Sequence, residues 1–338
     1  MSLHFIIDLA MKHNQKHQNT LKIAFILDPP EKLLLAEDST ISIMVEAQKR
    51  GHLSYYLEPQ NLFFSQGSLL AHAREVEIDS AFQVHTRSEL ILNLNACDAI
   101  LNRKEPPFDL SYLYLTQLLE WIEPAGVFVM NSPEGVRKAN EKLYILNFPE
   151  WIPRTLVTNH PDRIKEFQAS IHTDLVLKPL DQKGGAGIIL LKQNERNADE
   201  ICLQATDRGS KWIMAQEFLT DAYAKGDKRI LLLDGKILGQ YSKIPKAGEF
   251  RSNVSLGASY AKADLTPKEY KLVEALTPAL KRAGLYFVGI DVMQERLLEV
   301  NVTCPAGIYE INALEAKRVE TQVVDFLETT LLNCSKQR

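Results

Sequence analysis

The sequence predicts a fold that begins as an α/β domain and continues as α+β. Within residues 21–130, four short apolar runs alternate with helical stretches, which is typical of a parallel sheet with crossover helices. Beyond residue 174, the apolar runs follow one another closely and are joined by turn residues, which favours antiparallel hairpins. A chain of 338 residues is long enough for two or three domains.

The first domain contains four expected strands, at residues 22–28, 53–57, 97–101 and 126–130. Residues 39–51 have the apolar spacing of a helix, and Gly51 is well placed to end it. A further helix is predicted to begin at Ser132, because serine followed by proline and glutamate favours a helix N-terminus. We expect this helix to extend through residues 140–142.

The rest of the chain has seven expected strands, at residues 174–180, 188–192, 211–219, 228–233, 236–241, 287–293 and 296–302. The dipeptide Asp234-Gly235 predicts a tight hairpin turn between two of them. Residues 246–265 are polar, rich in small side chains and without periodicity. Because such long irregular segments are uncommon inside compact domains, we expect residues 246–265 to form a mobile lid.

The composition excludes several classes of protein. A net charge of -4 and a pI near 6.1 give no basic face for nucleic acid, and no apolar run is long enough to span a membrane. The four cysteines are scattered without a C-x-x-C pair, which indicates a reducing, cytoplasmic environment. Residues 1–20 place an apolar stretch before a polar run, the reverse of a signal peptide, and are expected to be a disordered extension.

A metal site is predicted near the C-terminus, in the hairpin formed by residues 287–293 and 296–302. A turn centred on Glu295 sets Asp291 opposite Glu299, and Asn301 shares a face with Glu299. Two carboxylates and an amide oxygen are hard ligands that suit Mg²⁺, with Mn²⁺ as the alternative ion. A polar outer face is the other interpretation, but the neighbouring residues of both strands are apolar, which favours the metal site.

A phosphate site is predicted around residues 178–187. Lys178 ends an apolar strand, and Gly184, Gly185 and Gly187 follow in a loop whose backbone N–H groups could approach phosphate oxygens. The loop matches neither a P-loop nor a dinucleotide fingerprint, so a flexible hairpin turn is an equal alternative.

Two further groups of cations could bind phosphate or carboxylate groups. Residues 226–229 include Asp227 and Arg229, and residues 251–253 include Arg251 and Asn253. Either group could equally be solvated surface charge. Arg103 and its neighbour Lys104 directly follow a predicted parallel strand, where ligands usually bind, although a proline-stiffened turn is the simpler interpretation.

Taken in this order, these segments resemble the bacterial glutathione synthetases from about residue 22 to residue 312. The matching segments are 25–29, 103–109, 131–142, 153–158, 177–186, 214–219, 226–229, 251–253, 287–291 and 299–305. The resemblance implies an ATP-grasp fold with an N-terminal Rossmann-like domain on the substrate side (21–130). It also implies a small lid subdomain (131–215) and a large subdomain with the metal site (216–338).

The resemblance also implies roles for individual residues. Binding of ATP is assigned to its phosphate lysines, its covering loop and the hinge that reads adenine through backbone groups: Lys142, Lys178, Gly184, Gly185, Gly187, Gln216, Glu217, Phe218 and Leu219, with Asp227 beside them. Asp291, Glu299 and Asn301 hold Mg²⁺. Arg229 steadies an acyl phosphate, while Arg251 and Asn253 touch the acyl substrate or the new bond.

The implied activity is an ATP-dependent ligation of γ-glutamylcysteine and glycine through an acyl phosphate, by a homo-oligomer that binds small molecules only. Other ATP-grasp ligases with a different amine acceptor and a non-catalytic nucleotide-binding regulator are the alternatives. A nicotinamide oxidoreductase is disfavoured because G-x-G-x-x-G is absent after the first strand. The chain departs from the family pattern at Glu105, Glu217-Phe218, Ser252, Cys304 and Ala306.

Overall fold

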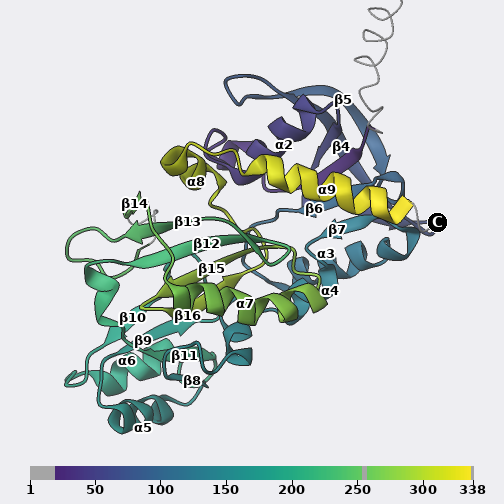
Figure 1. The fold of residues 1–338 in the computed structure, drawn as a ribbon. Coiled ribbons are helices and arrows are strands. Elements are labelled where there is room, and N and C mark those ends of the chain that lie inside the picture. Colours follow the sequence, from purple (N-terminus) through teal and green to yellow (C-terminus); the bar gives the residue numbers. More distant parts are fainter. Residues whose placement is uncertain (1–19, 253–256, 336–338) are drawn as a thin grey trace, which may run out of the picture.

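The computed structural model describes residues 20–252 and 257–335, which form three β-sheets arranged in chain order with helices around them (Figure 1). The first sheet has seven strands, the second has four and the third has five. Within these described ranges, no helix has both the length and the apolar character needed to cross a bilayer.

The centre of the first sheet is parallel, as predicted. Its order is β2 (Leu53–Leu57), β1 (Lys22–Ile26), β6 (Ala99–Asn102) and β7 (Phe128–Met130). The crossover helices are α2 (Ser39–Lys49) and α3 (Leu110–Glu120). Asp38 caps α2 by accepting from the Thr40 and Ile41 N–H groups, and Gly51 follows its end with a φ of +82°.

The first sheet continues in an antiparallel extension that the sequence did not predict. Strands β3 (Leu62–Ser65), β4 (Ser68–Ile78) and β5 (Val84–Asn93) add to the β2 side. The signal was the turn Gln66-Gly67, where both residues have positive φ, as a two-residue hairpin requires. Most β5 side chains are exposed, so this strand lacks the apolar run of a buried parallel strand.

The helix predicted from Ser132 is shorter than expected. Helix α4 (Pro133–Lys138) ends before Asn140, because Ala139 leaves the helical conformation at φ -112° and ψ 75°. The Asn140 side chain then accepts from the Lys142 and Leu143 N–H groups and starts a 3-10 turn, η5 (Leu143–Asn147). The expectation that Asn140, Glu141 and Lys142 lie on α4 is therefore wrong.

The second sheet is antiparallel, in the order β10 (Ile189–Leu191), β9 (Leu175–Pro179), β11 (Ile213–Glu217) and β8 (Thr155–Thr158). Helices α5 (Pro161–Ile171) and α6 (Ala198–Ala205) cover one face, where Ile164 and Cys202 pack against Leu177. The opposite face of the second sheet is turned toward the third sheet (Figure 1).

The third sheet is also antiparallel, in the order β14 (Ser259–Ala261), β13 (Lys236–Ile244), β12 (Asp227–Leu233), β15 (Phe287–Met293) and β16 (Arg296–Asn301). The predicted Asp234-Gly235 turn is confirmed, with positive φ at both residues. Helix α7 (Pro267–Arg282) covers one face, and Leu272 and Leu276 pack there against Ile290. The prediction that residues 246–265 form an irregular lid is partly wrong, because β14 lies within this range and pairs with β13.

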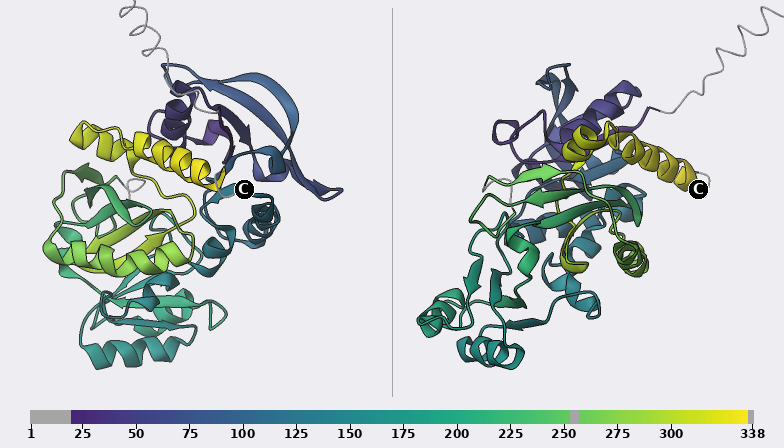
Figure 2. Two further views of the ribbon diagram at one scale, coloured as in Figure 1. Left: turned by 45° about the vertical axis from the view of Figure 1, so that its right-hand side comes forward. Right: turned by 60° about the vertical axis from the view of Figure 1, so that its left-hand side comes forward.

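The last two helices return to the first sheet. Helix α8 (Ile308–Glu315) leads into α9 (Glu320–Ser335), which lies along α2 (Figures 1 and 2). Val323 and Leu327 join the core formed by Ile41, Met44 and Phe25. We propose a division of the chain at residues 130 and 215, with α9 of the third part completing the first.

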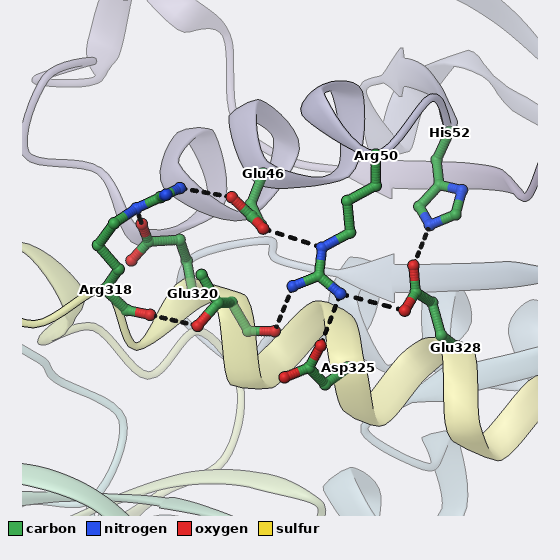
Figure 3. Close-up of polar contacts among 8 residues, drawn as sticks. Glu46, Arg50, His52, Arg318, Glu320, Asp325 and Glu328 are labelled. Carbon is green, nitrogen blue, oxygen red and sulfur yellow. Dashed lines mark hydrogen bonds and ion pairs between the residues drawn. The ribbon is translucent and has the colours of Figure 1, made fainter. Parts of the chain in front are cut away.

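Ion pairs connect α9 to α2 and to the residues that follow α2 (Figure 3). Arg50 donates to Glu46, Asp325 and Glu328, with the shortest distance 2.6 Å to Asp325. His52 Nδ1 accepts from the Leu21 N–H at 3.3 Å while Nε2 lies 2.9 Å from Glu328 Oε1, which makes it the Nε2–H tautomer. The start of β1 is thereby connected to the C-terminal helix.

Replacing Arg50 by alanine is expected to lower the free energy of unfolding by about 1–3 kcal/mol, because the buried Glu46 carboxylate and the half-buried Glu328 lose a partner. Thermal unfolding by calorimetry measures this. Lys49→Ala is the matched control, since Lys49 is exposed and has no ion pair within residues 20–252 and 257–335. Equal melting temperatures for both variants would show that the ion pairs do not hold α9.

Candidate active site

A cleft of about 930 Å³, including its mouth, lies between the second and third sheets. This is within the usual range for small-molecule sites, about 300–1,000 Å³. Most of the predicted site residues line it: Lys142, Lys178, Gly184, Gly185, Gln216, Glu217, Phe218, Leu219, Asp227, Arg251, Asp291 and Glu299. Gly187, Arg229 and Asn301 lie outside this lining, and Asn253 falls outside the described residues.

The predicted hairpin and its pairing of Asp291 with Glu299 are confirmed, but the turn is not centred on Glu295. Strands β15 and β16 are joined by Gln294-Glu295, and Asp291 pairs with Glu299. A register shift after Asp291 is what makes this pairing possible, because an unbroken two-residue hairpin would set Asp291 against Leu298. Asn301 follows two residues after Glu299, and its amide nitrogen lies 3.5 Å from Asp291 Oδ2.

Four charges of the third sheet meet beside the cleft, and three of them, Asp227, Lys243 and Asp291, line it. Arg229 donates to both oxygens of Asp291, at 2.6 and 3.1 Å. Lys243 lies 3.2 Å from Asp291 and 2.5 Å from Asp227. The strand register produces these pairs, because Arg229 stands opposite Asp291 and Asp227 stands opposite Lys243. We call Asp227, Arg229, Lys243 and Asp291 the charge cluster.

Burial and pairing act against each other in the charge cluster. Burial works against the ionised form of Asp291, but the Arg229 and Lys243 cations outweigh it and hold the pKa of Asp291 well below its usual range. For Asp227, burial is the stronger effect and raises the pKa despite the neighbouring Lys243 ammonium. Burial would lower the pKa of Lys243, and the two carboxylates raise it instead. Lys243 is therefore a firmly held cation beside the cleft.

The side chains of Asp291, Glu299 and Asn301 fit a hard divalent cation by the chemistry of their oxygens. In the described residues no three His, Cys, Asp or Glu side chains converge, so the amide of Asn301 is needed as the third ligand. Its nitrogen now donates to the Gly289 carbonyl at 3.2 Å and faces Asp291. Cation binding at this point would require the amide to turn its oxygen toward Asp291.

The two predicted phosphate lysines approach the cleft from different segments. Lys178 Nζ donates to Gln216 Oε1 at 2.6 Å, and burial lowers the pKa of Lys178 to about 8. Lys142, on the loop after α4, donates to the Gln182 carbonyl at 2.6 Å and lies 3.3 Å from Glu299. Both ammonium groups are held by neutral or acidic partners that an anionic ligand could replace.

The glycine-rich loop has a backbone that only glycine adopts readily. Gly184, Gly185 and Gly187 have φ values of +64°, +77° and +68°. A Cβ atom at Gly187 would also lie 2.9 Å from the Pro179 ring. The loop is tied to other segments, because Arg251 donates to the Gly185 carbonyl at 3.3 Å and Lys183 lies 2.7 Å from Glu105.

The segment 216–219 offers mainly backbone groups to the cleft. The Glu217 carboxylate is occupied by Arg154, at 2.9 Å to each oxygen, which explains how a charged residue is accommodated here. The Glu217 and Phe218 N–H groups donate to the Arg154 and Asp174 carbonyls. Among the described residues, the Leu219 N–H has no acceptor and is left for a ligand.

Arg251 and Ser252, the last residues of the first described range, line the cleft. Arg251 donates to both oxygens of Glu249, at 3.0 and 2.7 Å, and so lies between Glu249 and the glycine-rich loop. The Ser252 hydroxyl donates to Asp227 of the charge cluster. Arg251 is therefore not a solvated surface charge.

The proposal that Arg103 and Lys104 hold an anionic ligand is wrong for Arg103. Its side chain is buried, donates to Thr40 Oγ1 at 3.1 Å and to the Pro305 carbonyl at 2.8 Å, and lies over the Phe287 ring. Lys104 pairs with Asp28 at 3.0 Å. The first sheet thus uses Arg103 to hold the segment that follows β16.

Lys243 and the role of Glu141 were not predicted from the sequence. Lys243 sits two residues after the buried Tyr241 on β13, so a charged residue at an inward position was the available signal. Glu141 accepts from the Val302 and Thr303 N–H groups at 3.0 and 3.1 Å, which needs the loop after α4 and had no local signal. Burial and the nearby Glu299 raise the pKa of Glu141.

Comparison with known proteins identifies the family of the chain. Residues 21–137 match the family model of the prokaryotic glutathione synthetase N-terminal domain, and residues 141–316 match that of its ATP-grasp domain. A glutathione synthetase of Synechocystis is 41% identical over 319 residues, covering 91% of this chain and 99% of that protein. One from Vibrio parahaemolyticus is 38% identical over 311 residues, covering 91% and 98%.

Solved structures show the same fold at low sequence identity. The D-cycloserine synthetase DcsG is 12% identical with a TM-score of 0.65, and the alignment covers 90% of this chain and 99% of that one. The ATP-grasp ligase PsnB with a minimal precursor is 18% identical with a TM-score of 0.60, covering 91% and 98%. The chain has the ATP-grasp fold and belongs to the prokaryotic glutathione synthetase family.

Proposed function

We propose that this protein joins γ-glutamylcysteine to glycine at the expense of ATP, giving glutathione, ADP and phosphate. The observation that carries the proposal is the charge cluster, in which two fixed cations, Arg229 and Lys243, contact Asp291, one of the predicted Mg²⁺ ligands. The choice of substrates is supported by sequence identities of 38% and 41% to curated glutathione synthetases, over nearly their whole length.

In this proposal the nucleotide occupies the cleft between the second and third sheets. Lys142 and Lys178 bind its phosphates, and the Leu219 N–H binds the adenine edge. Asp291, Glu299 and Asn301 hold Mg²⁺, with Mn²⁺ as the alternative, and the ion when bound neutralises phosphate charge. The glycine-rich loop covers the phosphates and Arg251 holds the loop from the opposite side, so that water is excluded.

The reaction proceeds by phosphoryl transfer to the substrate carboxylate. A carboxylate oxygen of γ-glutamylcysteine attacks the γ-phosphorus of ATP, the bond to the β-phosphate oxygen breaks, and ADP leaves. The glycine amine then attacks the acyl carbon and phosphate departs, with one proton lost from the amine. Arg229 and Lys243 stabilise the negative charge that develops on the transferred group, and their fixed positions avoid reorganisation during the step.

We infer that the protein acts in the cytoplasm. Cys97 and Cys202 are buried free thiols, and burial raises the pKa of Cys97 to about 12, which keeps it protonated and unreactive.

Cys304 stands at one of the positions that depart from the family pattern, and burial raises the pKa of its thiol as well. It is therefore not proposed as a nucleophile.

Release of phosphate is expected only when ATP, Mg²⁺, γ-glutamylcysteine and glycine are all present. A coupled phosphate assay in which each component is omitted in turn measures this, and a panel of other amino acids in place of glycine tests the acceptor. Turnover with a different pair of substrates would retain the ligase chemistry and contradict the assignment to glutathione. ATP binding without turnover of any pair would favour a nucleotide-binding regulator.

Binding of ATP is expected to weaken as the pH rises through 8, because Lys178 has a pKa of about 8 and binds phosphate only when protonated. Burial has the largest effect and lowers this pKa; Lys142 also lowers it, while Glu299, Asp227 and Asp291 raise it. The dissociation constant measured by calorimetry should be about tenfold higher at pH 9 than at pH 7.

Lys178→Arg is the control for this pH dependence, because a guanidinium stays charged throughout the range. Its ATP affinity should change little between pH 7 and pH 9. An equal loss of affinity in Lys178→Arg and in the unchanged protein would assign the titration to another group.

A further inference from the structure

Glu141 is a partly buried acid next to Lys142 that does not itself line the cleft. Three donors converge on one of its carboxylate oxygens, Oε1: the Val302 N–H at 3.0 Å, the Thr303 N–H at 3.1 Å and the Thr303 hydroxyl at 2.8 Å. The Glu141 main-chain carbonyl accepts a fourth hydrogen bond, from the Val300 N–H at 3.0 Å. Both the side chain and the backbone of Glu141 therefore bind the end of β16 and the residues that follow it.

These hydrogen bonds lie on the outer edge of β16. This strand is the last one of the third sheet, so among the described residues its outer edge has no partner strand. Glu141 accepts from the N–H groups on either side of Asn301, whereas Asn301 itself pairs with Gly289 of β15. The backbone at Asn301 is thus held from both edges of the strand, by β15 on one side and by Glu141 on the other.

The loop that carries Glu141 is also attached to the second sheet. Asn140 donates to the Leu180 carbonyl at 3.2 Å, and Lys142 donates to the Gln182 carbonyl at 2.6 Å, both in the segment that follows β9. Glu141 lies between these two residues and binds the third sheet. The loop therefore connects the two walls of the cleft.

We propose that Glu141 is a positioning residue for the predicted cation site and for the phosphate lysine beside it. It holds the backbone of Asn301, so that the amide can present its oxygen beside Asp291, and it holds Lys142 at 3.3 Å from Glu299. The proposal rests on the proposed function, in which Asn301 holds Mg²⁺ and Lys142 binds phosphate. Residues that orient a metal ligand typically change metal affinity by about 10- to 100-fold when they are lost.

The contribution of Glu141 is hydrogen-bond acceptance rather than charge. Within residues 20–252 and 257–335, no lysine, arginine or histidine forms an ion pair with it, whereas Glu217 is paired with Arg154 at 2.9 Å. Burial and the nearby Glu299 raise the pKa of Glu141, so its negative charge is disfavoured at this position. A neutral acceptor of the same shape can take over the role, which makes Glu141→Gln the conservative variant and Glu141→Ala the disruptive one.

The test is the binding of Mn²⁺ to the full chain in the presence of ADP, followed by the electron paramagnetic resonance signal of free Mn²⁺. Glu141→Ala is expected to raise the Kd for Mn²⁺ by about 10- to 100-fold, and Glu141→Gln to leave it nearly unchanged. In the phosphate-release assay, Glu141→Ala should raise the half-saturating Mg²⁺ concentration by a similar factor and leave the KM for γ-glutamylcysteine unchanged. A partly unfolded sample would lower the number of sites without changing their affinity.

Glu269→Ala is the matched control. Glu269 is a buried glutamate that accepts from the Thr266 N–H at 2.8 Å and pairs with Lys228 at 2.8 Å, outside the lining of the cleft. This variant should lose thermal stability and keep the Mn²⁺ affinity of the unchanged protein. Thr303→Val is a second variant should Glu141→Ala fail to fold, because it removes one of the three donors to Glu141, and its Kd for Mn²⁺ should rise by about 2- to 10-fold.

Three results would overturn the positioning role: Mn²⁺ affinity that is unchanged in Glu141→Ala, an equal loss in Glu141→Gln, or an equal loss in Glu269→Ala. If the first occurs while γ-glutamylcysteine and glycine give turnover, the proposed function stands and the positioning role fails. If no substrate pair gives turnover but Glu141→Ala loses Mn²⁺ affinity as expected, the positioning role is supported and the proposed function is contradicted. An unchanged protein that binds no Mn²⁺ with ADP would contradict both.

Discussion

The charge cluster is the constraint around which the catalytic part of this fold is organised. Asp227, Arg229, Lys243 and Asp291 occupy one face of the third sheet, and all are buried or nearly so. An unpaired charge in such a position costs about 3–5 kcal/mol, so the four must be present together and in register. The same sheet face continues beneath α8 and α9 as the apolar residues Leu231, Leu233 and Phe287, which fix that register by burial.

The segment after β16 connects this cluster to the other sheets. Arg229 donates to the Ala306 carbonyl at 3.0 Å, and Arg103 of the first sheet donates to the neighbouring Pro305 carbonyl. Glu141, from the loop that leads to the second sheet, binds the Val302 and Thr303 N–H groups. Residues 302–306 therefore exchange hydrogen bonds with all three parts of the chain, which fixes the hairpin of β15 and β16 relative to the first sheet.

Features set by local sequence were predictable, and features set by long-range pairing were not. The parallel strands and the Asp234-Gly235 turn follow from apolar runs and turn residues, whereas the predicted pairing of Asp291 with Glu299 also needs a register shift that the sequence did not indicate. The mostly exposed strand β5, the early end of α4 at Ala139 and the internal use of Arg103 depend on contacts between distant segments. Lys243 was missed because a lysine on a strand is usually solvated, and its partners lie on two other strands, β12 and β15.

Steady-state kinetics of Lys243→Met tests most directly whether the charge cluster drives phosphoryl transfer. Methionine keeps the length of the side chain and removes the charge, so kcat should fall by about 100-fold or more while the KM for ATP changes little. Lys236→Met, at an exposed position of the same strand, should leave both constants unchanged. A Lys243→Met protein that is folded and turns over at the normal rate would contradict the account.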